Sequence, residues 1–182
     1  FPRQTLADWV EKGAGLLQFL VTRMKEKLMS GPYLQVDETP VKVMDPEIKG
    51  KCATGYLWVA GVPGGDVIFE FHRGRGQGCG AELLKNFHKG YLQRDGYSAY
   101  GAIARGRPGL IPVGCGAHLR RKFVDALEDD PVQAKWFVDE WRKLYLIERH
   151  ARDEGMEAAQ RLALRREKSQ PIVDAMKRRL DE

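Results

Sequence analysis

Several features are scarce in this sequence, and each scarcity excludes a class of protein. Only three cysteines occur in 182 residues, and a small odd number argues against a disulfide framework and for a reducing compartment. No run approaches the ~18 consecutive apolar residues that a membrane-spanning helix needs, and charges throughout residues 1–30 leave no signal peptide visible. Because the first residue is Phe1 rather than methionine, we expect the chain to be a piece of a longer protein.

The composition that remains is typical of a globular domain. Hydrophobic residues make up 43% of the chain and charged residues 30%, which is enough apolar material for a buried core and too much for a disordered chain. Thirty basic residues against 25 acidic ones give a net charge of +5. This mild excess permits nucleic acid as a partner without requiring one.

The first part of the chain is predicted to form one helix and three strands. Apolar residues recur at helical spacing over residues 4–29. Pro63-Gly64-Gly65 is typical of a hairpin turn, and Pro40 indicates a bulge or a sheet edge. Alternating apolar and polar residues predict three strands, at residues 33–43, 55–62 and 67–72.

After residue 73 the pattern changes, and helices alternate with short strands. Pro131 and Pro171 are predicted to break the helices near the C-terminus. The order of elements predicts an α/β fold with a mixed five-stranded sheet and flanking helices, followed by a C-terminal all-helical block. The expected helices are 81–88, 98–104, 117 onward, 133–150 and 154–180, and the expected strands are 91–93 and 110–113.

Two acidic residues are notable for their position in these predicted strands. Asp37 lies inside the first strand, where Asp is uncommon. Asp95 lies where the strand at 91–93 ends, although Asp-Gly is also a frequent turn. If the two strands are neighbours, the two carboxylates lie side by side, and paired carboxylates are suitable ligands for Mg²⁺. From the pattern alone, both a metal pair and an ordinary turn residue remain open.

Four segments carry a family resemblance, in order, across most of the chain. They are YLQVDETPVKV (33–43), GYLWV (55–59), YLQRDGYSAY (91–100) and GCGAHLRRKF (114–123). These segments resemble the transposases of the insertion sequence 66 family, and FPRQTLADWV (1–10) resembles the stretch before that family's catalytic domain. The resemblance implies a DDE-type transposase whose core is ribonuclease-H-like.

The resemblance also implies which residues act and with which cofactor. Asp37 and Asp95 match the first two catalytic acids and would hold two Mg²⁺ or Mn²⁺ ions, which assist hydrolysis and strand transfer at transposon ends. The third acid of the family, a glutamate in a segment resembling DNNxxER, has no match here. We expect it beyond residue 182, and Glu148 is the best substitute within the chain. The implied division is a linker helix at 1–30, the catalytic core at 31–128 and a helical insertion at 129–182.

DNA is the partner that this reading implies, both at transposon ends and at the target. The residues expected to contact it are Arg73, Arg75, His118, Arg120, Arg121 and Lys122. A homo-oligomer on DNA, no membrane partner, and a bacterial cytoplasmic location at the nucleoid follow from the same class. For the basic run and for His118, an ordinary solvated face and a structural histidine remain alternatives.

Two other functions remain as alternatives. The loop Gly74–Gly80 contains most of a G-x-G-x-x-A pattern, which runs from Gly76 to Ala81. This pattern would suit a nucleotide-binding enzyme, although a mobile loop is the favoured interpretation. A non-catalytic DNA-binding or assembly module is the second alternative. Cys115 and His118 have ligand-like spacing, but a zinc site that adds Cys52 and Cys79 is disfavoured against free thiols.

Overall fold

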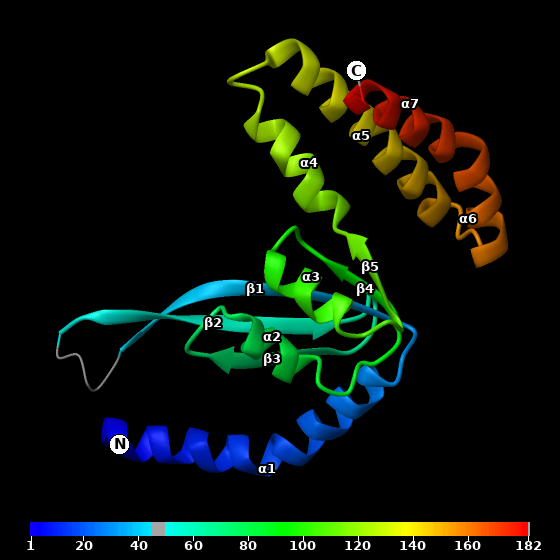
Figure 1. The fold of residues 1–182 in the computed structure, drawn as a ribbon. Helices are drawn as coiled ribbons and strands as arrows, with labels where there is room; N and C mark the ends of the chain where they lie inside the picture. The colour runs from blue at the N-terminus through cyan, green and yellow to red at the C-terminus, as the bar shows by residue number, and fades with distance from the viewer. Residues whose placement is uncertain (45–49, 182) are drawn as a thin grey trace. The chain divides into compact units, whose positions relative to one another are not determined.

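The computed structural model describes residues 1–44 and 50–181, and it divides into two compact units, Phe1–Cys115 and Gly116–Glu182. The first unit contains α1 (Arg3–Met29), β1 (Tyr33–Met44), β2 (Cys52–Gly61), β3 (Val67–His72), α2 (Gln77–Leu83), β4 (Gly90–Arg94), α3 (Ser98–Arg105) and β5 (Leu110–Gly114), as labelled in Figure 1.

Within the described residues, the strands of the first unit form one mixed five-stranded sheet in the order β3-β2-β1-β4-β5. The pairs β1–β2 and β2–β3 are antiparallel, whereas β1–β4 and β4–β5 are parallel. The turn at Pro63-Gly64-Gly65 forms as expected, because Gly64 adopts φ 72° and the Gly65 N–H bonds the Val62 carbonyl. The predicted α/β class and mixed five-stranded sheet are therefore confirmed.

One face of this sheet packs against α2 and α3 (Figure 1). Along β1, Leu34, Val36 and Glu38 are buried while the residues between them are more exposed, as the period of two in a strand requires. Pro40 causes no bulge, because its pairing with Tyr56 continues the β1–β2 register. The prediction of a sheet edge is correct, since β4 pairs with β1 only over residues 33–35. The core on this face comprises Leu34, Val36, Trp58, Ala60, Ile68, Leu83, Leu84, Phe87, Leu92, Tyr100 and Ile103.

The segment at Gly74–Gly80 differs from the expected mobile loop. Helix α2 already begins at Gln77, rather than at residue 81. Its position is fixed at Gly80, where an added Cβ would lie 3.1 Å from the Trp58 ring and 3.2 Å from Ile103. Glycine at this position therefore allows α2 to pack closely on the core, a role that glycine content alone does not distinguish from loop flexibility.

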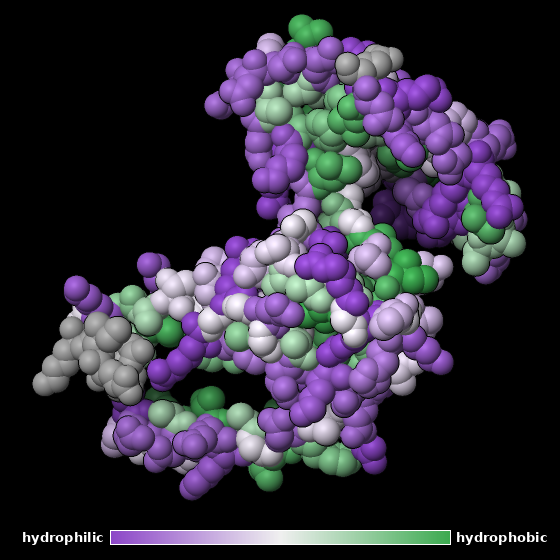
Figure 2. Space-filling view, viewed as in Figure 1, coloured by the Kyte–Doolittle hydropathy of each residue, from purple (hydrophilic) through white to green (hydrophobic). Residues whose placement is uncertain are grey.

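Helix α1 is anchored only by its C-terminal part. Leu28 and Met29 are buried in the core, and Lys25 pairs with Glu70 of β3 at 2.5 Å. Towards the N-terminus the large apolar residues of the helix are exposed, including Leu16 and Phe19. Figure 2 shows green apolar residues among the purple polar ones along this helix.

A glycine at the start of β4 holds a backbone conformation that other residues rarely adopt. Gly90 has φ 120°, and a Cβ there would lie 2.5 Å from the carbonyl oxygen of Pro32. We expect Gly90→Ala to lower the free energy of unfolding by about 1–3 kcal/mol, measured by urea denaturation followed by circular dichroism. The matched control is Gly13→Ala in α1, where nothing lies within 4 Å and a gain of about 0.5–1 kcal/mol is expected. Equal effects of the two substitutions would contradict the strain at Gly90.

The second unit is helical, with α4 (Gly116–Asp125), α5 (Pro131–Asp153), α6 (Ala158–Leu164), the π-helical turn η1 (Arg165–Ser169) and α7 (Gln170–Asp181). Pro131 breaks the chain as predicted, with Asp130 capping α5 by accepting a hydrogen bond from the Gln133 N–H. Phe123 of α4 stacks on Phe137 of α5 with ring centroids 4.3 Å apart. None of the helices in the described ranges offers the unbroken apolar length that a bilayer crossing demands.

The break predicted at Pro171 is wrong. The residues that flank the turn η1 remain in right-handed helical conformation, so α6 runs through η1 into α7. The Gln170 N–H bonds the Arg165 carbonyl, five residues back. The wider π turn directly before Pro171 makes room for the ring that would clash in a regular α-helix, and the helix therefore continues.

Candidate functional site: a carboxylate pair at one edge of the sheet

The two acids selected from the sequence lie at the same edge of the sheet. The parallel pairing of β1 with β4 extends to Gln35 opposite Gln93. Asp37 and Asp95 each follow two residues later. Asp37 lies inside β1, which continues to Met44, and Asp95 directly follows β4, so both acids lie just beyond the segment over which the two parallel strands pair. On the face of β1 that carries Asp37, Gln35 donates to the Tyr33 hydroxyl, which in turn donates to Gln93.

Backbone N–H groups orient both carboxylates. Asp37 Oδ1 accepts a hydrogen bond from the Glu38 N–H at 2.9 Å. Asp95 Oδ1 accepts one from the Tyr97 N–H, also at 2.9 Å, which is the side-chain-to-backbone turn that Asp forms readily. The Asp95 side chain is only 17% exposed. Each acid is thus held in a defined orientation.

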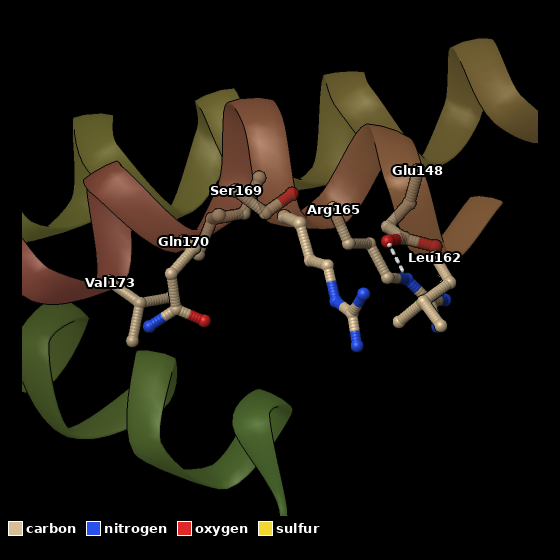
Figure 3. A pocket seen from close by; sticks show the side chains of 8 residues that line it. Glu148, Leu162, Arg165, Ser169, Gln170 and Val173 are labelled. Carbon is tan, nitrogen blue, oxygen red and sulfur yellow. Dashed lines mark hydrogen bonds and ion pairs between the residues drawn. The ribbon is translucent and has the colours of Figure 1, made fainter. Parts of the chain in front are cut away.

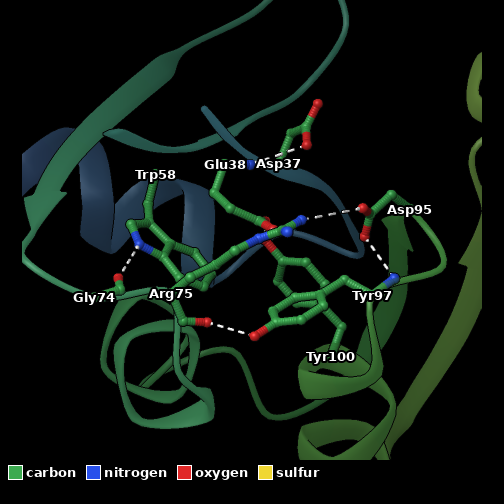
Figure 4. Close-up of polar contacts among 8 residues, drawn as sticks. All are labelled: Asp37, Glu38, Trp58, Gly74, Arg75, Asp95, Tyr97 and Tyr100. Atoms are coloured by element: carbon green, nitrogen blue, oxygen red, sulfur yellow. Dashed lines mark hydrogen bonds and ion pairs between the residues drawn. The ribbon is translucent and has the colours of Figure 1, made fainter. Parts of the chain in front are cut away.

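A third acid, Glu38, lies on the opposite face of β1 and forms a polar network that the sequence reasoning missed. Its side chain is fully buried, and Arg75 Nε donates to Glu38 Oε1 at 2.7 Å. The Tyr100 hydroxyl donates to the other oxygen, Oε2. In Figure 4 the Arg75 guanidinium and the Tyr100 hydroxyl both reach the Glu38 carboxylate. A buried carboxylate is tolerated because both of its oxygens are hydrogen-bonded.

The acids of this network shift the pKa values of Tyr100 and Arg75. Burial, and then the hydrogen bond to Glu38, raise the pKa of Tyr100 well above its ordinary value, and the charges of Glu38, Asp95 and Asp37 raise it further. The hydrogen bond to Glu38 also raises the pKa of Arg75. Tyr100 therefore remains a hydrogen-bond donor, and the carboxylates of Asp37 and Asp95 both lie within electrostatic range of one phenol.

Arg75 connects the loop before α2 with Glu38 of β1 and with Asp95 after β4. Its guanidinium lies over the Tyr97 ring, 4.3 Å from the centroid, and its Nη2 is 3.9 Å from Asp95 Oδ2. The Tyr97 hydroxyl donates to the Arg75 carbonyl at 2.7 Å. Trp58 Nε1 donates to the Gly74 carbonyl at 3.3 Å. The loop before α2 is therefore held by hydrogen bonds to the carbonyls of Gly74 and Arg75.

The donor set at the edge suits a hard divalent cation. Asp37 and Asp95 supply carboxylate oxygens, which are the ligands that Mg²⁺ and Mn²⁺ prefer. Across residues 1–44 and 50–181, no group of three or more His, Cys, Asp or Glu side chains could hold a metal ion. The edge thus provides two of the carboxylates that such a centre needs, and the described residues supply no third.

Glu148, the substitute for the third acid, lies in the second unit and is engaged by arginine. Arg165 Nε and Nη2 donate to its two carboxylate oxygens at 2.6 and 2.7 Å (Figure 3). This hydrogen bonding lowers the pKa of Glu148. The partner of Glu148 is therefore Arg165 of the turn η1. The pair borders a hollow lined by Leu144, Leu162, Arg166, Ser169, Gln170 and Val173.

The residues expected to contact DNA are distributed over both units. Arg73 and Arg75 follow β3 and are exposed on the first unit, although Arg75 is engaged as described above. His118, Arg120, Arg121 and Lys122 belong to α4 of the second unit, where Arg121 and Lys122 are exposed. Arg120 lines a hollow together with Asp139 and Arg142 of α5. Exposed basic side chains thus occur on each unit.

The geometry of the glycine-rich segment does not suit a dinucleotide. The segment follows β3, an edge strand that pairs antiparallel with β2, whereas a dinucleotide loop follows a central parallel strand. Gly76 and Gly78 do not adopt positive φ, and Gly80 packs on the core. For zinc, Cys52 is an exposed free thiol, and the described residues provide no cluster of ligands.

The fold and the site define an α/β protein with two oriented carboxylates just beyond the paired segment of two adjacent parallel strands. The family model described as "Transposase IS66 family" matches residues 1–182, and the chain belongs to this family. The resemblance drawn from the four sequence segments is thereby confirmed. No solved structure matches the chain significantly.

Similar proteins occur in Sinorhizobium fredii (strain NBRC 101917 / NGR234). Uncharacterized protein y4qI is 33% identical over 189 residues, which cover 96% of this chain and 34% of that protein. Uncharacterized protein y4jD is 32% identical over 192 residues, which cover 98% of this chain and 37% of that protein. The chain therefore spans about a third of the length of these curated relatives.

Proposed function

We propose that the chain supplies the ribonuclease-H-like catalytic core of a DDE-type transposase, which hydrolyses phosphodiesters and transfers strands at transposon ends. The observation that carries the proposal is the placement of Asp37 within β1 and of Asp95 directly after β4, each two residues beyond the last paired residues of these adjacent parallel strands. The strand order β3-β2-β1-β4-β5 supports it, as does membership of a transposase family. The whole protein's activity, substrates and partners are part of the proposal.

In this function the two aspartates hold divalent ions at the scissile phosphate. When bound, two Mg²⁺ or Mn²⁺ ions activate the attacking oxygen and stabilise the leaving oxygen. Asp37 and Asp95 keep their carboxylates oriented through the Glu38 and Tyr97 N–H groups. A third carboxylate completes the set. Glu148 remains a candidate for that role only if it leaves Arg165.

The DNA duplex is the substrate, both at transposon ends and at the target. Arg73, Arg120, Arg121 and Lys122 neutralise its phosphates, and His118 contacts the backbone near them. This function places the protein at the bacterial nucleoid, in the cytoplasm, as a homo-oligomer assembled on DNA. A non-catalytic DNA-binding or assembly module remains the second candidate, because the described residues supply two acids rather than three.

The direct test is Mn²⁺ binding to the chain, titrated by electron paramagnetic resonance. Losing one carboxylate ligand is expected to weaken affinity by more than about tenfold, since even outer-shell partners of a metal are worth that much. We therefore expect Asp37→Asn and Asp95→Asn each to raise the Kd by at least that factor. The control is Asp129→Asn, which alters an exposed acid of the second unit and is expected to leave Kd unchanged.

The outcome also separates the two candidate functions. If Asp37→Asn and Asp95→Asn bind Mn²⁺ as tightly as the unaltered chain, the proposed metal centre is wrong. Binding of transposon-end DNA by a chain that shows no aspartate-dependent Mn²⁺ binding would then favour the non-catalytic module.

A further inference from the structure

A positively charged side chain already occupies the space beside Asp95. The guanidinium of Arg75 reaches across from the loop before α2, with Nε on Glu38 at 2.7 Å and Nη2 at 3.9 Å from Asp95 Oδ2. In Figure 4 this guanidinium lies between the carboxylates of Glu38 and Asp95, whereas the Asp37 carboxylate points away from it. The arrangement puts a monovalent cation at one of the two proposed metal ligands.

The position of this guanidinium is determined by other groups, and not by Asp95. Glu38 is fully buried, and Arg75 Nε donates to its Oε1 at 2.7 Å. The Tyr97 ring supports the guanidinium from one side at 4.3 Å, and the Tyr97 hydroxyl holds the Arg75 carbonyl. Arg75 thus keeps its contacts with Glu38 and Tyr97 even if its guanidinium moves away from Asp95.

Asp95 has one oxygen committed and one that faces Arg75. Oδ1 accepts the Tyr97 N–H, so Oδ2 is the oxygen through which a divalent ion would be bound. An ion at Oδ2 lies a few ångströms from the positive charge of the Arg75 guanidinium. The repulsion between the two cations is substantial even at a partly exposed site. When the ion enters, the guanidinium therefore either withdraws from Asp95 or stays and weakens the binding of the ion.

We propose that Arg75 is a resident counter-cation of the carboxylate pair, which competes with the divalent ion for Asp95 and lowers the ion's affinity. The inference rests on the proposed function, since it concerns the same metal centre. Arg75 acts as a positioning residue: it neutralises Asp95 while the ion is absent, and it yields when the ion arrives. Its fixed partner Glu38 keeps it close enough to return.

The test compares Mn²⁺ Kd values of the chain and of Arg75 variants by electron paramagnetic resonance. Arg75→Gln removes the charge, and we expect about a tenfold lower Kd, the size of one partly screened charge–charge interaction. Arg75→Lys keeps the charge and is expected to lie within about threefold of the unaltered chain. The matched control is Arg23→Gln, which breaks an Arg–Glu pair of similar geometry, 2.8 Å, on the exposed surface of α1.

A second variant separates the competing cation from the charge of Glu38. Arg75→Gln leaves the buried Glu38 carboxylate without its arginine, which threatens folding and adds negative charge near the ion. The double variant Glu38→Gln/Arg75→Gln removes both charges, and we still expect a Kd at least about threefold lower than in the unaltered chain. An unchanged or higher Kd in both variants would overturn the proposal.

The failure of this inference is distinguishable from the failure of the proposed function. If the unaltered chain binds Mn²⁺ and loses it in Asp37→Asn and Asp95→Asn, the metal centre stands, and equal Kd values with and without Arg75 refute only the counter-cation. If the unaltered chain and Arg75→Gln both lack aspartate-dependent binding, the metal centre and the counter-cation are refuted together.

Discussion

Replacing Trp58 with alanine is expected to lower the free energy of unfolding by about 3–5 kcal/mol, the range measured for large aromatic residues removed from cores. Trp58 is fully buried, its ring lies 5.9 Å from that of Tyr100, and Gly80 is in close contact with it. A cavity at this point loosens α2 and α3 together. Urea denaturation followed by circular dichroism measures the loss.

The control for this prediction is Trp9→Ala in α1. Trp9 is 52% exposed and packs against Phe1, so its removal is expected to cost less than about 1 kcal/mol, as for most surface positions. The two variants lose the same side chain, which isolates burial as the cause. Losses of similar size at the two positions would contradict the account of the core.

The second large effect is expected at Glu38. Glu38→Ala leaves the buried hydroxyl of Tyr100 without its acceptor and Arg75 without its ion-pair partner. Because the Arg75 side chain is itself 43% exposed, the main cost is the buried Tyr100 hydroxyl left unsatisfied, about 1–3 kcal/mol. Thermal and urea denaturation measure this loss, and the isosteric Glu38→Gln, which still accepts a hydrogen bond, is expected to lose clearly less.

The matched control for Glu38 is Glu82→Ala. Glu82 pairs with Lys85 on the exposed surface of α2, with its side chain 61% exposed. Exposed pairs contribute about 0–1 kcal/mol, so the control is expected to remain close to the unaltered chain. If Glu38→Ala were as mild as Glu82→Ala, the network around Glu38 would have no structural role.

The sheet and the adjacency of the two strands that lead to Asp37 and Asp95 were predictable because they depend on local patterns. Alternating side chains indicate β1, and an acid inside a strand is unusual enough to be noticed. A helix between two strands commonly returns the chain to a parallel neighbour, which brings strand ends together. The family resemblance assigned the same two residues to catalysis, and the strand register is consistent with that assignment.

The network of Glu38, Arg75 and Tyr100 was missed because its members lie 37 and 62 residues apart in the chain. One signal was nevertheless present: Glu38 has the same strand parity as Leu34 and Val36, so it faces the core. An acid at a core-facing position implies a buried partner. The sequence does not reveal that the partner is Arg75, because the glycines around Arg75 resemble a solvent-exposed loop.

The π turn before Pro171 was unpredictable for a different reason. Proline is a reliable helix breaker only where the helix keeps its regular hydrogen-bond pattern. A local widening from 165 to 169 preserves the helix, and no residue type marks such a turn in advance. Because the helix continues through this turn, Arg165 lies where it can pair with Glu148.

The most direct test of the metal centre is anomalous diffraction from crystals of the chain soaked in Mn²⁺. The proposed function predicts at least one manganese peak in contact with carboxylate oxygens of both Asp37 and Asp95, with the Arg75 guanidinium farther from Asp95 Oδ2 than the 3.9 Å of the ion-free structure. Well-ordered Asp37 and Asp95 side chains whose carboxylates lie more than about 8 Å apart, with manganese bound only elsewhere, would contradict it.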